Sequence, residues 1–200
     1  MEQRNYVRRT PYEEYCDMPE DVRCELINGR IVMMASPSLA HESICSNLHG
    51  LLWNYLRGKR CRVYQSVGVQ FSEDEPINNA LRPDIAVVCD PNKFKKQGIV
   101  GAPDLIVEVI SPSSSSHDLV WKFNSYQDEG VKEYWAIDPE RSLVFQFILE
   151  NGVYTTKMHS FTDKIPVAAL DGCVIDVAEV AQEPTVESQL EPASEPVQTV

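Results

Sequence analysis

The chain has 200 residues, of which 43% are hydrophobic and 24% are charged, a balance that is ordinary for one soluble globular domain. Its formal net charge of −12 excludes a protein that coats nucleic acid by charge alone, although an enzyme with a local basic patch and a bound cation stays open. No apolar run approaches the roughly 18 residues of a membrane helix, and the first residues lack the apolar core of a secretory signal. We therefore expect a cytoplasmic protein that does not enter membranes.

The six cysteines are scattered, with no C-x-x-C pair and no histidine at zinc-ligand spacing. Several lie in apolar stretches, where a reduced cysteine behaves as a small hydrophobic residue. The reducing cytosol keeps such thiols unpaired. We therefore expect all of them to be inert free thiols: Cys16, Cys24, Cys45, Cys61, Cys89 and Cys173.

The N-terminal part of the chain predicts a short helix and a β-hairpin. Thr10 is a typical N-cap, with proline next and glutamate three residues on, so a helix should cover residues 11–16. Asn28-Gly29 lies between two runs of alternating apolar residues, which is the strongest short-range hairpin signal. The two strands should therefore cover residues 23–27 and 31–35.

A longer amphipathic helix comes next. Its apolar residues recur at the i, i+4, i+7 and i+8 spacing from about residue 40 to residue 56, and Arg57-Gly58 ends it. Residues 61–72 alternate like one strand, and residues 73–80 are rich in turn formers. Residues 90–98 should form a polar loop. Its basic run at 93–98 is either a solvated loop, which is the favoured interpretation, or a contact for phosphate.

The second half predicts two buried strands, a helix and an antiparallel end. The two buried strands are almost entirely β-branched or leucine, as expected when both faces are covered. Two short apolar segments close the body. The predicted segments are strands at 85–89, 105–111 and 131–138, a helix at 117–129, and a hairpin of 143–149 with 153–160 around Asn151-Gly152.

This order of elements predicts a mixed α/β domain, with a central sheet flanked by helices and with β-hairpins near both ends. The domain should cover residues 1–180. Residues 181–200 contain four glutamates, no lysine or arginine and no aromatic residue, so we expect an acidic, disordered tail rich in proline and glutamate.

Two acids stand out because they occupy apolar strands. Asp84 follows Pro83 at the start of one strand, where it is either a turn residue or a functional acid. Glu108 lies inside Leu-Ile-Val-Glu-Val-Ile, where it needs a cation, an arginine or several donors. A buried salt bridge or an edge-strand position would explain Glu108 equally well, so neither acid alone establishes a site.

A lysine on the following helix gives these acids a third partner. Asp118, Lys122 and Tyr126 are spaced i, i+4 and i+8, so they lie on one face of that helix. An ordinary solvated Asp–Lys pair would have the same spacing. Glu108 and position 110 point to the same side of the strand, and position 110 is isoleucine.

The combined stretch RPDIAVV…GAPDLIVEVISPSSSSHDLVWKFNSYQDEGVKEYWAIDPE, with CELINGRIV and SPSLAHESI upstream, resembles a known family. It is similar to the Uma-type restriction-endonuclease-like proteins (domain of unknown function 820), a branch of the PD-(D/E)XK nuclease superfamily. The resemblance covers about residues 10–180 and implies a restriction-endonuclease-like fold. It also implies that the strand lysine is lost at Ile110 and that Lys122 replaces it.

The resemblance further implies a magnesium-dependent endonuclease that hydrolyses phosphodiester bonds in DNA. Asp84, Glu108 and the Val109 carbonyl oxygen would hold one or two Mg²⁺ ions, with Mn²⁺ as an alternative. Lys122 would orient or deprotonate the attacking water, or stabilise the transition state, and Asp118 would hold Lys122. Tyr126 would contact phosphate or pack.

Two upstream residues are supporting candidates under the same resemblance. Glu25 is either an additional metal ligand or a structural acid, and His41 either approaches the site or only begins its helix. The family also suggests a homodimer, because cleavage of two strands often needs two sites. Ile110 and the acidic surface favour an alternative, a weakly active or inactive relative that binds nucleic acid or protein. A phosphodiesterase that acts on RNA or nucleotides is a further alternative.

Overall fold

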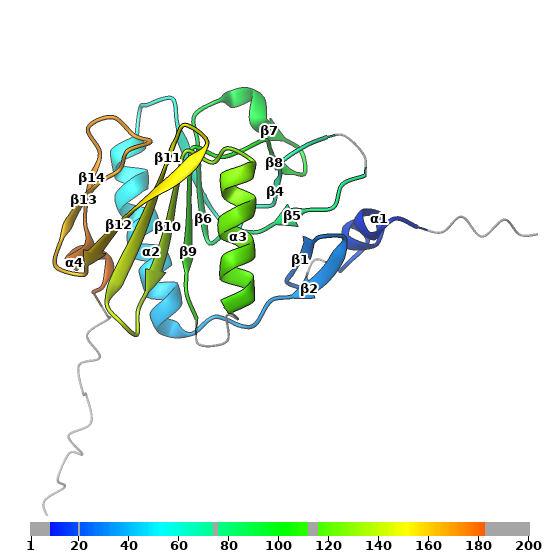
Figure 1. Cartoon of the computed structure of the whole chain (residues 1–200), viewed down its shortest axis with the longest axis horizontal. Coiled ribbons are helices and arrows are strands. Elements are labelled where there is room, and N and C mark those ends of the chain that lie inside the picture. Colours follow the sequence, from blue (N-terminus) through cyan, green and yellow to red (C-terminus); the bar gives the residue numbers. More distant parts are fainter. Residues whose placement is uncertain (1–8, 20, 74–75, 112–115, 183–200) are drawn as a thin grey trace, which may run out of the picture.

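The computed structural model describes residues 9–19, 21–73, 76–111 and 116–182, with the backbone alone at 116–118 (Figure 1). The predicted disordered tail therefore lies almost wholly outside the described residues. No helix within these ranges is long and apolar enough to cross a bilayer.

The larger sheet has six strands in the order β12-β11-β10-β9-β6-β3. Its central pair, β9 and β10, is parallel, and its other neighbours are antiparallel. The strands are β3 (Arg62–Gln65), β6 (Ile85–Val88), β9 (Leu105–Val109), β10 (Glu133–Asp138), β11 (Leu143–Glu150) and β12 (Val153–Ser160).

A second six-stranded sheet has the order β2-β1-β5-β4-β8-β7, and a two-stranded sheet closes the C-terminal part. The strands of the second sheet are β1 (Cys24–Ile27), β2 (Arg30–Met33), β4 (Val69–Gln70), β5 (Ala80–Leu81), β7 (Phe94–Lys95) and β8 (Gly98–Val100). The small sheet pairs β13 (Lys164–Pro166) with β14 (Val174–Asp176).

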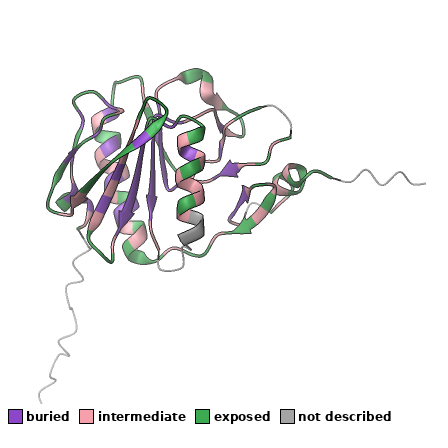
Figure 2. Cartoon of the chain, in the orientation of Figure 1, coloured by how far each residue is buried: buried purple, intermediate pink, exposed green. Residues whose placement is uncertain are grey.

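Two long helices cover opposite faces of the larger sheet (Figure 1). Helix α2 (Leu39–Leu56) packs its apolar stripe, including Leu48, into the core that contains Val107. Helix α3 (Ser116–Asp128) places Tyr126 in the core on the other side, with Ile106. Both faces of the central strands are thereby buried (Figure 2). The short helices are α1 (Pro11–Cys16), η1 (Pro91–Lys93) and α4 (Val177–Val180).

This arrangement confirms the α/β class, the two long helices and both Asn-Gly hairpins. Asn28 and Gly29 have φ values of 49° and 69°, the left-handed pair that a tight hairpin turn requires. Thr10 caps α1 in a reciprocal capping box with Glu13, as predicted.

Two predictions about the middle of the chain were wrong. The segment 61–72 is not one strand, because Ser66 turns the backbone with a φ of 47° and sends β3 and β4 into different sheets. The polar segment 90–98 is not only a loop, because it contains η1, β7 and the start of β8. The single central sheet predicted from sequence is consequently two sheets.

The prediction of six free thiols was also wrong for one pair. Cys61 and Cys89 form a disulfide: Cys61 immediately precedes Arg62 and Cys89 immediately follows Val88, and Arg62 and Val88 are paired at the ends of β3 and β6. The register of two strands that are far apart in sequence brings these cysteines together, and no local sequence pattern predicts this disulfide. The other cysteines are free, as predicted: Cys16, Cys24, Cys45 and Cys173.

Candidate active site

A cavity of about 220 Å³ lies where the two large sheets meet the N-terminal end of α2 and the face of α3. Its lining includes three acids, one from the second sheet, one from the larger sheet and one from the segment that joins them. These acids are Glu25, Glu108 and Asp84, and Lys122 and His41 line the same cavity.

Asp84 lies where the pairing of β6 with β9 ends, and it takes the place of the next strand partner. The register of β6 with β9 stops at Ile85 and Val107, which leaves the Val109 N–H without a strand partner. Asp84 Oδ2 accepts that N–H at 2.8 Å. The bond ties the segment before β6 to the end of β9, so Asp84 is brought next to the strand that carries Glu108.

Glu108 points toward α3 because β9 side chains alternate between its two covered faces. Its Oε1 accepts hydrogen bonds from Lys122 Nζ at 2.9 Å and from the Tyr126 hydroxyl at 2.6 Å. Because Lys122 and Tyr126 are four residues apart on one face of the helix, both side chains reach the same carboxylate oxygen. The expected approach of Lys122 to a strand acid is confirmed by this distance.

Glu25 completes the set from the second sheet. Its Oε1 accepts the Arg82 backbone N–H at 2.7 Å and Lys122 Nζ at 3.2 Å. Lys122 thus lies between Glu25 and Glu108, with only 12% of its side chain exposed, and links the two sheets through one ammonium group.

Burial and charge set the protonation of this cluster. Burial raises the pKa of Glu108 to about 7, because the opposing effect of Lys122 is smaller. Burial would lower the pKa of Lys122, but Glu108 and Glu25 outweigh it, so the pKa is raised and the ammonium is charged at neutral pH. Burial also raises the pKa of Tyr126, whose hydroxyl therefore keeps its proton and donates to Glu108.

His41 joins the cluster from the first turn of α2. Its Nε2 lies 3.1 Å from Asp84 Oδ2, and its Nδ1 lies 3.7 Å from Cys45 Sγ. The hydrogen bond to Asp84 raises the pKa of His41, although burial opposes the shift. One ligand atom from each of His41, Cys45 and Asp84 lies within 4.8 Å of the others, so nitrogen and sulfur donors stand beside the carboxylates.

The acid cluster fits a hard divalent cation. Each carboxylate uses one oxygen for the contacts described above, and the second oxygens accept no hydrogen bond from the described residues: Asp84 Oδ1, Glu25 Oε2 and Glu108 Oε2. All three side chains and Val109 line the cavity. Carboxylate and carbonyl oxygens with room for water are the donor set that Mg²⁺ prefers.

The structure therefore brings together Asp84, Glu108, Lys122, Glu25 and His41. Of the two roles expected for Tyr126, the structure favours packing, because that side chain is fully buried and donates its hydroxyl to Glu108. Asp118 lies in the first turn of α3, and its side chain is outside the described residues. Ile110 lines the cavity without contributing a charge.

Sequence reasoning missed two contributors to this site. Arg23 lines the cavity together with Glu25, and the alternation of side chains along the first hairpin strand could have placed both on one face. Cys45 lies one helical turn after His41, and this i, i+4 spacing was a readable signal.

Comparison with known proteins places this chain in a family. A family model described as "Putative restriction endonuclease", Uma2, matches residues 11–178, which include every acid of the cavity. The protein belongs to the Uma2 family. This agrees with the resemblance carried by the sequence motifs, and the acids of the cavity lie within the matched residues.

Relatives of this Uma2 chain include two uncharacterized proteins of Synechocystis. One is 34% identical over 117 residues, covering 57% of this chain and 60% of the relative, so the match spans less than two thirds of that protein. The other is 30% identical over 131 residues, covering 62% and 72%. A crystal structure described as "a putative nuclease belonging to DUF820" from Anabaena variabilis superposes with a TM-score of 0.71 at 20% identity, covering 87% of this chain and 98% of the other, which shows the shared restriction-endonuclease-like fold.

Proposed function

We propose that this Uma2 protein is a magnesium-dependent endonuclease that hydrolyses phosphodiester bonds in DNA. One observation carries the proposal: three buried carboxylates and a charged lysine converge on one cavity, and each carboxylate keeps one oxygen without a hydrogen-bond donor among the described residues. The family description, "Putative restriction endonuclease", supports the reaction class.

Asp84 and Glu108 would hold the ion, with Val109 supplying its carbonyl oxygen and Glu25 a further carboxylate. A bound Mg²⁺ supplies a water of lowered pKa and neutralises charge on the scissile phosphate; Mn²⁺ would do the same. His41 positions Asp84 by its 3.1 Å contact, and Tyr126 fixes one oxygen of Glu108.

Lys122 replaces the strand lysine that Ile110 cannot supply. Because the neighbouring carboxylates raise its pKa, Lys122 is charged at neutral pH. It therefore donates hydrogen bonds to the attacking water or to a phosphate oxygen, where it stabilises developing negative charge, rather than acting as a base. Its contacts with both Glu25 and Glu108 hold the ammonium at the cavity before substrate arrives.

A binding module without catalysis is the second candidate. Ile110 occupies the usual lysine position, and the net charge of −12 disfavours tight nucleic-acid binding without a cation. The cavity itself distinguishes the candidates, since a pure binding module has no use for three convergent acids, whose burial is costly.

The test is cleavage of supercoiled DNA, single-stranded DNA and RNA with Mg²⁺, with Mn²⁺ and with EDTA. We expect DNA cleavage that requires the divalent cation. We also expect this cleavage to be lost in Asp84→Asn and in Glu108→Gln. Asp104→Asn is the matched control, because Asp104 is also a buried acid but pairs with Lys132 outside the cavity. Thermal unfolding should first show that each variant is folded. Activity retained in both site variants would overturn the assignment, and binding without cleavage would establish the second candidate.

We also propose that the protein acts as a homodimer, because one cluster hydrolyses one strand and a double-strand break needs two. This part of the proposal rests on the chemistry of two-strand cleavage, and it is tested separately below.

A further inference from the structure

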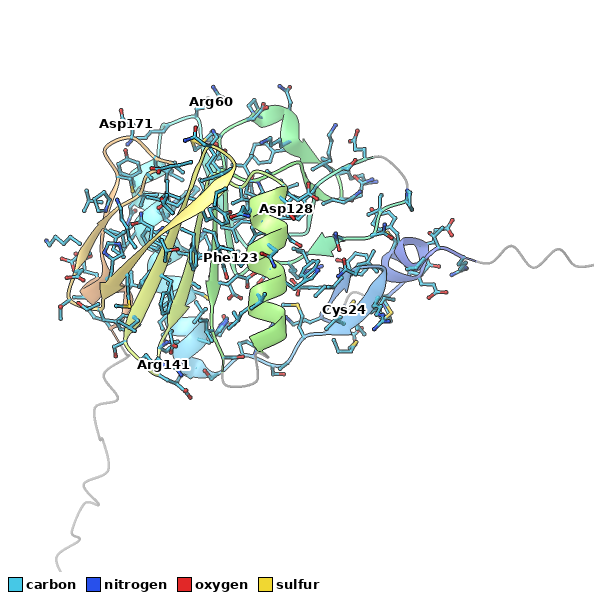
Figure 3. All side chains as sticks on the ribbon, in the orientation of Figure 1. Cys24, Arg60, Phe123, Asp128, Arg141 and Asp171 are labelled. Atoms are coloured by element: carbon cyan, nitrogen blue, oxygen red, sulfur yellow. A yellow bond between two sulfur atoms is a disulfide. The ribbon has the colours of Figure 1, made fainter. Side chains whose placement is uncertain are left out.

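A second cavity, of about 330 Å³, lies on the other side of the first hairpin from the active site. Successive residues of β1 separate the two: Cys24 lines this second cavity, whereas Glu25 lines the active-site cavity. Figure 3 labels Cys24 on this hairpin, beside α1. The volume of this second cavity is at the lower end of the range for small-molecule sites.

Arg82 lines this cavity with a guanidinium that pairs with no carboxylate of the described residues. Its Nε is buried and has no hydrogen-bond partner among the residues that the structure describes, and its Nη1 makes a long 3.4 Å contact with the Ser66 carbonyl. Its side chain also interacts with the Tyr15 hydroxyl. No carboxylate among the described residues lies within 4.0 Å of the guanidinium, so its known partners are neutral. A buried N–H without an acceptor is unusual, and a guanidinium that pairs with no described carboxylate suits an anionic ligand.

Two aromatic rings line the cavity. Tyr12 and Tyr15 lie on one face of α1 with ring centroids 6.3 Å apart and an interplanar angle of 24°. Tyr12 is oriented by its hydroxyl, which donates to Gln70 Oε1 at 2.8 Å. Val69 and Ile99 add apolar lining from the sheet. Aromatic faces of this kind stack on planar ligands, and every nucleobase has such a face.

We propose that this cavity binds a nucleoside monophosphate, with the phosphate on Arg82 and the base against the two tyrosine rings. The anion site follows from Arg82 alone, whereas the choice of a nucleotide among planar anions rests on the proposed nuclease function. The nucleotide is either free or the end of a nucleic-acid strand. Arg82 also donates its backbone N–H to Glu25, so the same residue contacts both cavities from opposite sides.

The test is calorimetric titration of the full chain in EDTA, which removes metal-dependent binding at the active site. The probes are adenosine monophosphate, adenosine, inorganic phosphate and a 5′-phosphorylated dinucleotide. We expect the monophosphate to bind at least about tenfold more tightly than adenosine or inorganic phosphate, as a charged contact and a stacked base together require. Tighter binding of the dinucleotide would identify a strand end as the source, and equal or weaker binding a free nucleotide.

Arg82→Gln and Tyr15→Leu should each lower the affinity for adenosine monophosphate by about tenfold. Arg23→Gln, in the active-site cavity, should keep this affinity within about twofold of the wild-type value. If Arg82→Gln fails to fold, Tyr15→Leu still tests whether this cavity binds the nucleotide. Absence of saturable binding, equal affinity for adenosine, or an equal loss in Arg23→Gln would overturn the inference. Cleavage assays on the same preparations separate the two proposals: cleavage without nucleotide binding refutes only this one, and binding without cleavage refutes only the nuclease.

Discussion

Two buried glutamates on neighbouring strands show how surroundings decide what one residue type does. Glu133 is fully buried, and neutral N–H donors occupy both of its oxygens: Trp135 and Gln146 at 2.6 and 2.7 Å, and Ala169 at 2.7 Å. Glu108 meets a charged lysine and keeps one oxygen without a donor among the described residues. Glu133 is therefore a structural acid, and Glu108 has the free coordination that a metal ligand needs.

Glu108 should make the stability of the metal-free protein depend on pH. Its pKa is about 7 when folded, because of burial, and near 4.5 when unfolded, so the folded state binds more protons between these values. Its contribution therefore falls as pH rises from 4.5 to 7, by at most about 3 kcal/mol, since one pKa unit corresponds to about 1.4 kcal/mol. Urea unfolding in EDTA at pH 5 and pH 7.5 measures this fall.

Glu108→Gln is the matched comparison for that measurement, because the amide cannot titrate. The variant should lose less stability than the wild type over the same pH interval. An identical pH dependence in both proteins would show that burial does not perturb Glu108.

Lys122→Met should separate metal binding from catalysis. The variant removes a cation that lies 2.9 Å from Glu108 and 3.2 Å from Glu25, so Mg²⁺ affinity should stay equal or increase. Under the proposed function, cleavage should fall by about 100-fold or more, because the variant lacks the charge proposed to stabilise the transition state. Calorimetry with Mg²⁺ and single-turnover cleavage measure the two effects.

Lys132→Met serves as the control for Lys122→Met, since Lys132 pairs with Asp104 outside the cavity and is largely exposed. It should leave both metal affinity and cleavage unchanged. A Lys122 variant with full cleavage activity would assign the lysine a purely structural role.

At the scale of elements, the second sheet depends on one close backbone approach. Gly98 has a φ of 139°, and a Cβ there would lie 2.4 Å from the Gly68 carbonyl oxygen. That same oxygen accepts the Ile99 N–H at 2.9 Å and so starts the pairing of β4 with β8. Only glycine fits this position without moving a strand.

Gly98→Ala should therefore destabilise the protein by about 3 kcal/mol or more, through strain together with a clash. Gly130→Ala is the matched control: Gly130 also has a positive φ, 80°, but no atom lies within 4 Å of the added Cβ. It should cost about 1 kcal/mol. Urea unfolding of both variants compares them, and equal losses would show that the close approach in the second sheet is unimportant.

The sequence predicted those elements whose signals are local. The Asn28-Gly29 turn, the Thr10 cap and the apolar stripe of α2 are all encoded within a few residues, and the structure contains each of them. The two-residue strands of the second sheet escaped prediction because so short a strand shows no periodicity and is defined by distant partners. The Cys61–Cys89 disulfide was missed for the same reason.

At the scale of the whole molecule, the candidate site belongs to no single element. Lys122 joins Glu25, 97 residues away in the chain, to Glu108 across the two sheets. The sequence could nominate these residues because acids in apolar strands are conspicuous, and the family resemblance indicated the helix lysine. It could not show which oxygen each acid leaves free, or that Tyr126 is buried, because both depend on how the sheets and α3 pack together.

The proposed homodimer predicts a particular pattern of DNA products. One chain contains one acid cluster among its described residues, so a single copy would nick supercoiled DNA, and linear product would appear only after a second independent event. Two copies held together would cut both strands in one encounter, so linear DNA should form early and without accumulation of the nicked circle. Sedimentation velocity should then give twice the 22.6 kDa mass of the chain. A mixture of wild type with excess Glu108→Gln tests the coupling directly: mixed dimers carry one working cluster, so nicked circles should replace linear DNA. A linear product that persists in proportion to the wild-type chain would show that each copy works alone.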